Sequence, residues 1–352
     1  MGFWLFVKKF DWGLLLLALV ILTLSMLTFH DTGARGNLIV QKQFILILVS
    51  VGLMLTVSFF DYRIFKNYTI SSVLVYSLSI LLLLIALASN PVRGSSAWIF
   101  IGGYGFQPSE FAKLAILILL AKYFSQKHIE IYRTHHILAS GIYAAVPATL
   151  TLLQPDFGSM MVFVAMWLFM LLFAGIKRKH LMAIIMIGIV VFSFAWFLAF
   201  KPYQKDRIIV FVNPYIDPRG IGYNTIQAQT TFGSGGIFGT FFNREKKLSN
   251  LVPEQHTDFA FASYGQRFGF VGVTVLLGLI ITLIVRIGLI GTRTNNNFAK
   301  LFSLGLITII FVHVFLNAGM NLGILPITGI PFSFLSYGGS HLITLMVGLG
   351  LI

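Results

Sequence analysis

Glu110 and Lys113 are the first candidates for chemistry, because these two charges lie at the start of an apolar run. They belong to the segment QPSEFAK at 107–113, whose proline and serine favour the first turn of a helix. A spacing of three places both side chains on one helix face. Charges inside a membrane are costly, so the two should pair or line a cavity. A structural ion pair and a substrate-binding role both remain open.

Asp258 is the acid best placed to accept a proton. It lies in PEQHTDF at 253–259, where the longest polar segment meets an apolar run, and His256 is two residues before it. A carboxylate at the edge of the hydrocarbon is partly desolvated, which makes it a better base. The alternative is that Asp258 is the N-cap of the following helix.

Two further segments combine polar groups with residues that break helices. Asp156 lies in QPDFGS at 154–159, where it either caps the next helix or faces a polar cavity. The stretch 317–340 is dense in Gly, Pro and Asn, which membrane depth tolerates only where the backbone is buried in protein or lines a cavity. His313, just before it, is expected to be a buried, hydrogen-bonded histidine and not a proton relay.

Several kinds of chemistry find no support. The chain has no cysteine, which excludes a thiol nucleophile, a thiolate metal site and disulfides. It shows no phosphate-binding loop, dinucleotide fingerprint, serine-hydrolase elbow or HExxH helix in a suitable context. An ATP-driven pump is therefore not indicated.

The composition is that of an integral membrane protein. Of 352 residues, 57% are hydrophobic and 10% are charged, whereas soluble domains carry about 25% charged residues. A cytosolic enzyme is excluded. The net charge of +14 does not indicate a nucleic-acid partner, since the basic residues are scattered between apolar runs.

The apolar runs predict an all-α polytopic fold with about ten transmembrane helices, since each crossing needs about 20 residues. The first is expected to be a retained span and not a signal peptide. The predicted spans are 12–29, 43–60, 69–89, 106–124, 137–153, 158–175, 181–200, 260–285, 301–320 and 335–352. We interpret 1–352 as a single transmembrane domain, with one long loop at 201–258 between spans 7 and 8.

The basic residues set the predicted orientation. With the N-terminus in the cytoplasm, most Lys and Arg residues fall on the inner side, and the short outer loops hold only Arg35, Lys42 and Arg93. The long loop at 201–258 then faces outward. We therefore expect a multi-pass protein of the bacterial cytoplasmic membrane whose active site is extracytoplasmic.

Together these segments resemble the SEDS family, the shape, elongation, division and sporulation proteins of bacterial cell-wall synthesis. The resemblance covers essentially the whole chain and includes motif residues in the long loop and near the C-terminal end. Its segments are FQPSE with Lys113, QPDFG, PEQHTDF, SYGGS at 336–340 and, in the loop, Asn213-Pro214, Asp217, Gly222-Tyr223, Gln227 and GSGG at 233–236. Asp11-Trp12 and Asp61-Tyr62-Arg63 resemble the elongation branch more than the division branch.

The resemblance implies a peptidoglycan glycosyltransferase that polymerises lipid II into glycan strands during cell elongation. It implies a class B penicillin-binding protein, a transpeptidase, as partner and makes a divalent cation such as Mg²⁺ plausible, with no organic cofactor. The family's catalytic aspartate falls on Asp258, and Asp258 is also a possible metal ligand. Its other sensitive charged positions fall on Glu110, Lys113 and Asp156. The remaining candidate site residues are Arg207, Gln227, His256 and Ser336.

This chain departs from the family pattern at three places, one of which is the glycine-rich stretch after Gly236, which runs into Thr240-Phe241-Phe242-Asn243-Arg244. Members usually carry acidic residues after the HTDF segment, where this chain has Gly265-Gln266-Arg267. Arg267 is therefore expected to meet a substrate phosphate or a loop acid. The usual proline two residues after Pro331 is Ser333 here.

The hypothesised mechanism needs one base and one positive group. Asp258 would take the proton from the acceptor hydroxyl, and Arg207, Lys113 or a bound Mg²⁺ would stabilise the pyrophosphate leaving group. Two other functions remain open. A flippase for lipid-linked precursors fits the spans and intramembrane charges, and a non-catalytic scaffold for the transpeptidase would tolerate loss of Asp258.

Overall fold

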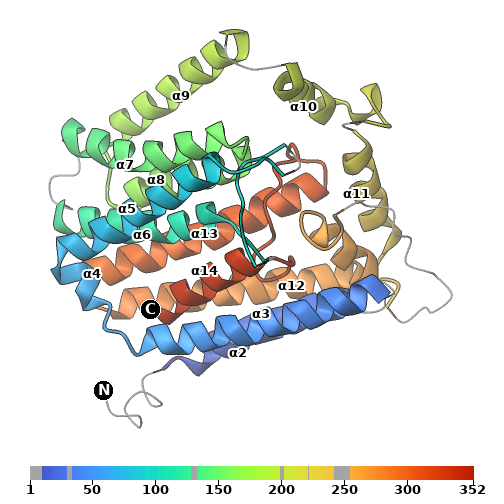
Figure 1. The fold of residues 1–352 in the computed structure, drawn as a ribbon, viewed down its shortest axis with the longest axis horizontal. Coiled ribbons are helices and arrows are strands. Elements are labelled where there is room, and N and C mark those ends of the chain that lie inside the picture. Colours follow the sequence, from blue (N-terminus) through green and yellow to red (C-terminus); the bar gives the residue numbers. More distant parts are fainter. Residues whose placement is uncertain are drawn as a thin grey trace.

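The chain folds into a bundle of helices that run roughly alongside one another (Figure 1). The computed structural model describes residues 10–29, 34–92, 94–102, 104–127, 133–198, 202–220, 222–241 and 254–352. The short helix α4 lies at one end of the bundle, and α11 lies at the other. The expected all-α membrane fold is confirmed.

The only sheet in the described part of the chain is the antiparallel pair β1–β2. In order they are α2 (Trp12–Phe29), α3 (Ala34–Ser58), α4 (Arg63–Asn67), α5 (Thr69–Leu87), β1 (Ile99–Ile101), β2 (Tyr104–Phe106), α6 (Pro108–Lys127), α7 (Thr134–Leu153), α8 (Phe157–Phe173), α9 (Arg178–Leu198), α10 (Pro202–Val212), the 3₁₀ turn η1 (Pro214–Ile216), α11 (Tyr223–Ser234), α12 (Ala260–Arg293), α13 (Asn297–Asn321) and α14 (Gly339–Gly350).

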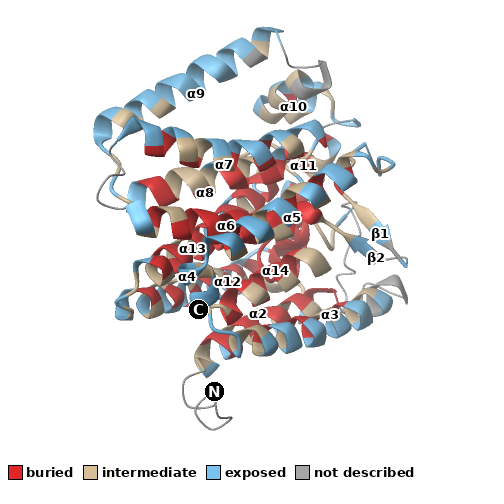
Figure 2. Cartoon of the chain, turned by 60° about the vertical axis from the view of Figure 1, so that its left-hand side comes forward, coloured by how far each residue is buried: buried red, intermediate tan, exposed pale blue. Residues whose placement is uncertain are grey.

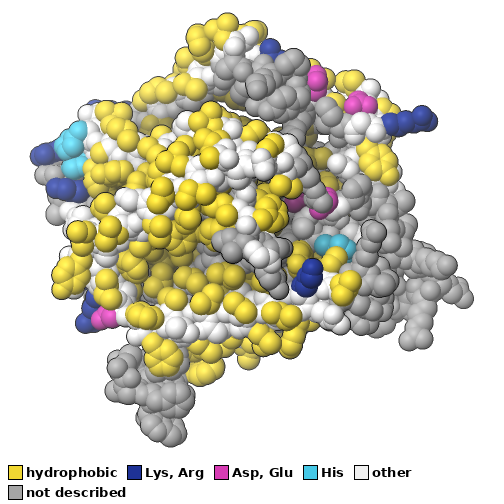
Figure 3. Space-filling model, in the orientation of Figure 1, with side chains coloured by type: hydrophobic (Ala, Val, Ile, Leu, Met, Phe, Trp, Pro, Cys, Tyr) yellow, Lys and Arg dark blue, Asp and Glu magenta, His cyan; other side chains and the backbone are white. Residues whose placement is uncertain are grey.

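Each predicted span coincides with one of these helices. Among the described residues, seven helices are long and apolar enough to cross a membrane, namely α2, α3, α5, α7, α9, α12 and α13. The helices α8 and α14 are apolar but shorter. Hydrophobic side chains cover much of the surface (Figure 3), as expected for a face that contacts lipid.

Some predicted boundaries are wrong. The second span was expected from 43, but α3 begins at Ala34, and α12 continues eight residues past 285 to Arg293. The last span was expected from 335, whereas α14 begins at Gly339. The reason is that hydropathy cannot tell a buried apolar loop from a helix, and Phe332, Phe334 and Leu335 are buried in a loop.

The helices α6 and α13 form the centre of the bundle (Figure 2). In the most apolar 18-residue stretch of α13, 72% of the residues are buried, whereas no residue is buried in the corresponding stretch of α9. Gly305 of α13 permits close packing, because a Cβ there would lie 2.0 Å from Leu117 of α6 and 3.2 Å from Met170 of α8. Glu110 and Lys113 of α6 are therefore surrounded by protein.

The segment between α13 and α14, called here the 322–338 loop, enters the bundle without regular structure. Its residues Ile330, Ser333 and Leu335 are at most 2% exposed. Buried backbone groups need hydrogen-bond partners, and side chains supply them. Leu335 O accepts from Ser25 Oγ, and Ser336 Oγ accepts from Phe332 N at 2.8 Å. Of the two predicted possibilities, burial in protein therefore holds for the part of the loop at 330–336, whereas Leu322 and Ile324 are exposed.

The predicted long loop contains the helices α10 and α11, and α11 packs on α12. Within the glycine-rich run at 233–236, α11 continues through Gly233 and ends at Ser234. Gly235 follows, and a Cβ there would lie 2.1 Å from Gly265 O and 2.9 Å from Gln266 Cα. This glycine lets the two backbones touch.

We predict that Gly235→Ala destabilises the protein by about 1–3 kcal/mol, the scale of overpacking a tight contact. Gly233→Ala is the matched control, because a Cβ at Gly233 meets nothing within 4 Å. Thermal unfolding of both variants in detergent measures the difference. Equal midpoints for the two variants would contradict the packing described.

Candidate active site

Glu110 and Lys113 form the ion pair that their spacing predicts. Lys113 Nζ lies 2.7 Å from Glu110 Oε1, and each side chain is 1% exposed. Both lie in the first two turns of α6, at the bundle centre. Because neither charge reaches the surface, the geometry favours a structural role for the pair.

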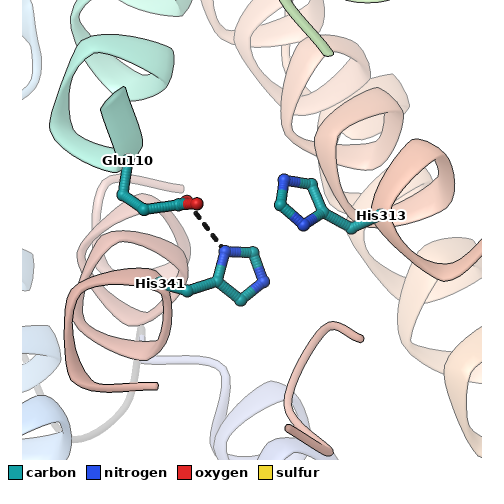
Figure 4. Close-up of side chains that lie close together, drawn as sticks. All are labelled: Glu110, His313 and His341. Carbon is teal, nitrogen blue, oxygen red and sulfur yellow. Dashed lines mark hydrogen bonds and ion pairs between the residues drawn. The ribbon is translucent and has the colours of Figure 1, made fainter. Parts of the chain in front are cut away.

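Two histidines complete this cluster, as Figure 4 shows for Glu110, His313 and His341. His313 Nδ1 lies 3.1 Å from Pro331 O, and its Nε2 lies 3.0 Å from Lys113 Nζ. A carbonyl can only accept, so we assign the proton to Nδ1, and Nε2 accepts from the ammonium. His341 Nδ1 lies 2.8 Å from Glu110 Oε2. The rings of His313 and His341 stack with their centroids 4.2 Å apart.

Glu110, His313 and His341 also have the geometry of a metal site, with one ligand atom from each lying within 4.8 Å of the others. Two nitrogens and one oxygen suit zinc-like ions better than Mg²⁺, which prefers oxygen. The Lys113 ammonium, however, contacts both Glu110 and His313. The ammonium contacts two of the three candidate ligand residues, so the Lys113 side chain supplies the positive charge that a metal ion would otherwise provide.

Asp156 is the N-cap of α8, one of its two predicted roles. Its Oδ1 accepts from Ser159 N at 2.9 Å, and its Oδ2 accepts from Ser159 Oγ at 2.7 Å. Gln107 Nε2 also donates to Oδ2, at 3.2 Å. Gln107 N in turn donates to Ser340 Oγ at 3.0 Å. Three of the sequence motifs therefore meet at this point.

Asp258 lies half-buried at the start of α12. The interpretation of Asp258 as the N-cap is wrong by one residue, because the N-cap position is Phe259. Two amides hold the Asp258 backbone, since Asn317 Nδ2 and Asn321 Nδ2 donate to its carbonyl at 2.9 and 3.1 Å. A Cβ at Gly329 would lie 3.7 Å from Asp258 Oδ2, so the carboxylate lies beside the 322–338 loop.

His256 and Ser336 attach the segment before Asp258 to the same loop. Ser336 is 6% exposed, and its Oγ donates to Thr257 O at 2.6 Å. Tyr337 N donates to His256 O at 2.7 Å, and the His256 ring packs edge-on against Phe29. Burial lowers the pKa of His256, although Glu254 opposes the shift. His256 and Ser336 therefore help to position the backbone of the segment that precedes Asp258.

The other predicted residues are placed less fully. Gln227 lies half-buried on α11. Arg207 belongs to α10, and its side chain lies outside the described residues. Arg267 is 4% exposed, donates to Thr28 O at 3.2 Å and lies over the Phe241 ring. Its described contacts therefore join α12 to α2 and to the segment after α11. Its expected contact with a phosphate or a loop acid stays a prediction, because the loop residues 242–253 lie outside the described residues.

Sequence reasoning missed His341 and the roles of Asn317 and Asn321. His341 follows the SYGGS segment directly, so its position beside a motif was the available signal. Ser333 Oγ lies 3.5 Å from His341 Nε2, at the limit of a hydrogen bond. The departure from proline at Ser333 thus places a hydroxyl next to a histidine that the sequence analysis had not considered.

The fold and the buried charges define an integral membrane protein in which four of the sequence motifs contact one another around the 322–338 loop and the start of α14. The family model described as "Cell cycle protein" (FtsW/RodA/SpoVE) matches residues 5–352. The chain therefore belongs to the FtsW/RodA/SpoVE family, which confirms the resemblance to the SEDS proteins.

Relatives of known name cover nearly the whole chain. The peptidoglycan glycosyltransferase MrdB of Escherichia coli is 30% identical over 97% of this chain and 92% of its own length. The peptidoglycan glycosyltransferase RodA of Treponema pallidum is 30% identical over 98% of this chain and 97% of its own.

Two solved structures are also similar. A chain from a study of polymerization and crosslinking by a peptidoglycan synthase complex has a TM-score of 0.85 and 29% identity, over 97% of this chain and 96% of that chain. The rod shape determining protein RodA of Thermus thermophilus has a TM-score of 0.70 and 25% identity, over 97% and 95%.

We predict that Glu110→Ala and Lys113→Ala each destabilise the protein by about 3–5 kcal/mol, because each leaves one buried charge unpaired. The charge swap Glu110→Lys with Lys113→Glu should not restore stability. A lysine at 110 would face the donor His341 Nδ1, and a glutamate at 113 would face the acceptor His313 Nε2. Thermal unfolding in detergent measures this, and a swapped protein of wild-type stability would contradict the assigned histidine roles.

Proposed function

We propose that this protein polymerises lipid II into glycan strands on the outer face of the bacterial cytoplasmic membrane, with Asp258 as the base. As a member of its family it is a peptidoglycan glycosyltransferase. The observation that carries the proposal is the position of Asp258. Its backbone is fixed by two buried amides, while its carboxylate is half-buried beside the 322–338 loop.

The reaction needs a proton acceptor at one place. In lipid II the anomeric carbon carries an anionic pyrophosphate, and the 4-hydroxyl of the acceptor sugar attacks that carbon. As the new C–O bond forms and the bond to pyrophosphate breaks, the hydroxyl proton passes to Asp258. An α-linked donor that gives a β-linked product has inverted, so no covalent enzyme intermediate is required.

The departing pyrophosphate needs positive charge nearby. Lys113 is a poor candidate, because it is 1% exposed and donates to Glu110 and His313. We therefore favour Arg207, on the helix α10 that follows the seventh predicted span. A carboxylate such as Asp258 together with substrate phosphates is also an ordinary setting for Mg²⁺, which would neutralise the leaving group when bound.

Two alternatives use the same fold. A flippase would move the lipid-linked precursor across the membrane and would need no base at Asp258. A scaffold would need only its surfaces for a transpeptidase. We favour the enzyme because the PEQHTDF and SYGGS segments are joined directly beside the Asp258 carboxylate, and because relatives are named as glycosyltransferases. We also propose that the N-terminus is cytoplasmic and that the protein acts in cell elongation.

The purified protein should polymerise purified lipid II in detergent, where no membrane is present to be crossed. Glycan strands of many disaccharide units, resolved by gel electrophoresis, are the expected product. If the folded protein yields no strands, either alone or together with its transpeptidase partner, the proposal that it is an enzyme is wrong. Transfer of lipid II between the leaflets of vesicles by such a protein would support the flippase.

We further propose that the partner is a class B penicillin-binding protein and that the two proteins associate mainly through membrane spans. The described surface is rich in exposed apolar residues, and helices in lipid associate by close packing of small residues. Deletion of the partner's transmembrane helix should therefore abolish co-purification. Association that survives this deletion would contradict a membrane-embedded interface.

A further inference from the structure

The helix α13 carries three polar residues on one face, His313, Asn317 and Asn321. Their spacing of four places them one above the other along the helix. All three are 0% exposed. Polar side chains buried this deeply destabilise a protein unless they are hydrogen-bonded, so their partners indicate what they do.

The partners of the two asparagines are backbone groups of the segment around Asp258. Asn317 Nδ2 donates to Asp258 O at 2.9 Å, and Asn321 Nδ2 donates to the same oxygen at 3.1 Å. Asn321 Nδ2 also lies 3.1 Å from Asn317 Oδ1. The two amides therefore hold each other as well as the Asp258 carbonyl.

Asn321 also satisfies the start of α12. The first amides of a helix have no partner within the helix, and the N-cap side chain usually serves the second or third of them. The N-cap residue here is Phe259, which cannot accept, and Ala262 N donates instead to Asn321 Oδ1 at 3.0 Å. Asn321 thus caps α12 from another helix: its Nδ2 donates to Asp258 O, just before Phe259, and its Oδ1 accepts from Ala262 N, three residues after Phe259.

The same face of α13 holds the loop beside the carboxylate. Asn317 Nδ2 donates to Ile330 O at 2.6 Å, and His313 Nδ1 lies 3.1 Å from Pro331 O. Gly329, the residue before Ile330, lies beside Asp258 Oδ2. A single rigid helix therefore fixes both the backbone of Asp258 and the loop that borders its carboxylate.

We infer that Asn317 and Asn321 are positioning residues for the base. Asn321 supplies to Ala262 the cap that a neighbouring side chain such as Asp258 would otherwise provide. The two amides together fix the direction in which the Asp258 carboxylate leaves the backbone. This inference rests on the proposed function, because it assumes that Asp258 is the base.

The first test is kinetic. Asn317→Ala and Asn321→Ala should lower kcat for lipid II polymerisation by about 10–100-fold, the scale of misplacing a catalytic group by about 1 Å. KM should change little, because neither side chain reaches the surface. The control is Thr308→Ala on the same helix, which removes a buried hydroxyl that bonds Leu304 O within α13. It should leave kcat unchanged.

The second test is independent of activity. The chain contains no cysteine, so Asp258→Cys introduces a unique thiol. The rate at which this thiol reacts with a water-soluble methanethiosulfonate reagent measures how accessible the side chain at position 258 is. Adding Asn317→Ala or Asn321→Ala should change that reaction rate several-fold, and adding Thr308→Ala should not. Only variants that keep the wild-type elution volume in size exclusion are compared. Asn317→Ala leaves the cap of Ala262 in place, so it tests the idea even if Asn321→Ala does not fold.

The outcomes separate the two proposals. If Asp258→Asn is inactive while folded Asn317→Ala keeps wild-type kcat and the thiol rate is unchanged, the positioning role is wrong and the base stands. If Asp258→Asn polymerises at the wild-type rate, the proposed function of Asp258 is wrong. In that case a changed thiol rate would still establish that the two amides set the conformation at position 258.

Discussion

The structure depends on the burial of one positive charge, that of Lys113, at the centre of a helical bundle. A lone ammonium would be very unfavourable there, so the protein must surround it with acceptors. Glu110 on the same helix supplies the opposite charge, and His313 on α13 supplies a ring nitrogen. His341 on α14 holds the other carboxylate oxygen. The need to pair Lys113 brings α6, α13 and α14 into contact at the same level of the bundle. The 322–338 loop connects α13 to α14.

From this cluster the constraint extends to the candidate base. His313 contacts Lys113 through one ring nitrogen and the loop carbonyl of Pro331 through the other. One and two turns further along α13, Asn317 and Asn321 hold the carbonyl of Asp258. The buried cluster and the carboxylate at the bundle end are therefore joined by one helix face. On this view the cluster is not a second reaction centre, and it sets where α13 presents its amides.

Much of this architecture could be predicted from the sequence, because hydropathy and motif order are local properties. The predicted spans coincide with helices, and Glu110 and Lys113 are paired as a spacing of three requires. Other features depend on long-range contacts that no spacing reveals. His341 is 231 residues from its partner Glu110 in sequence. Likewise, the capping of α12 by Asn321 could not be foreseen, because the same sequence is equally compatible with Asp258 as the cap.

The central claim is that Asp258 accepts the proton of the attacking hydroxyl, and the polymerisation rate of purified Asp258→Asn tests it most directly. The asparagine keeps the shape of the side chain but cannot accept the proton. We expect the variant to fold and to lose about 10²–10⁴-fold in rate, the scale of general base catalysis. Asp61→Asn is the control, since that carboxylate is 58% exposed and near Arg63 at the α4 end of the bundle. Partial rescue of Asp258→Asn by added Mg²⁺ would instead indicate a metal-binding role. A folded Asp258→Asn protein that polymerises lipid II as fast as the wild type would contradict the claim.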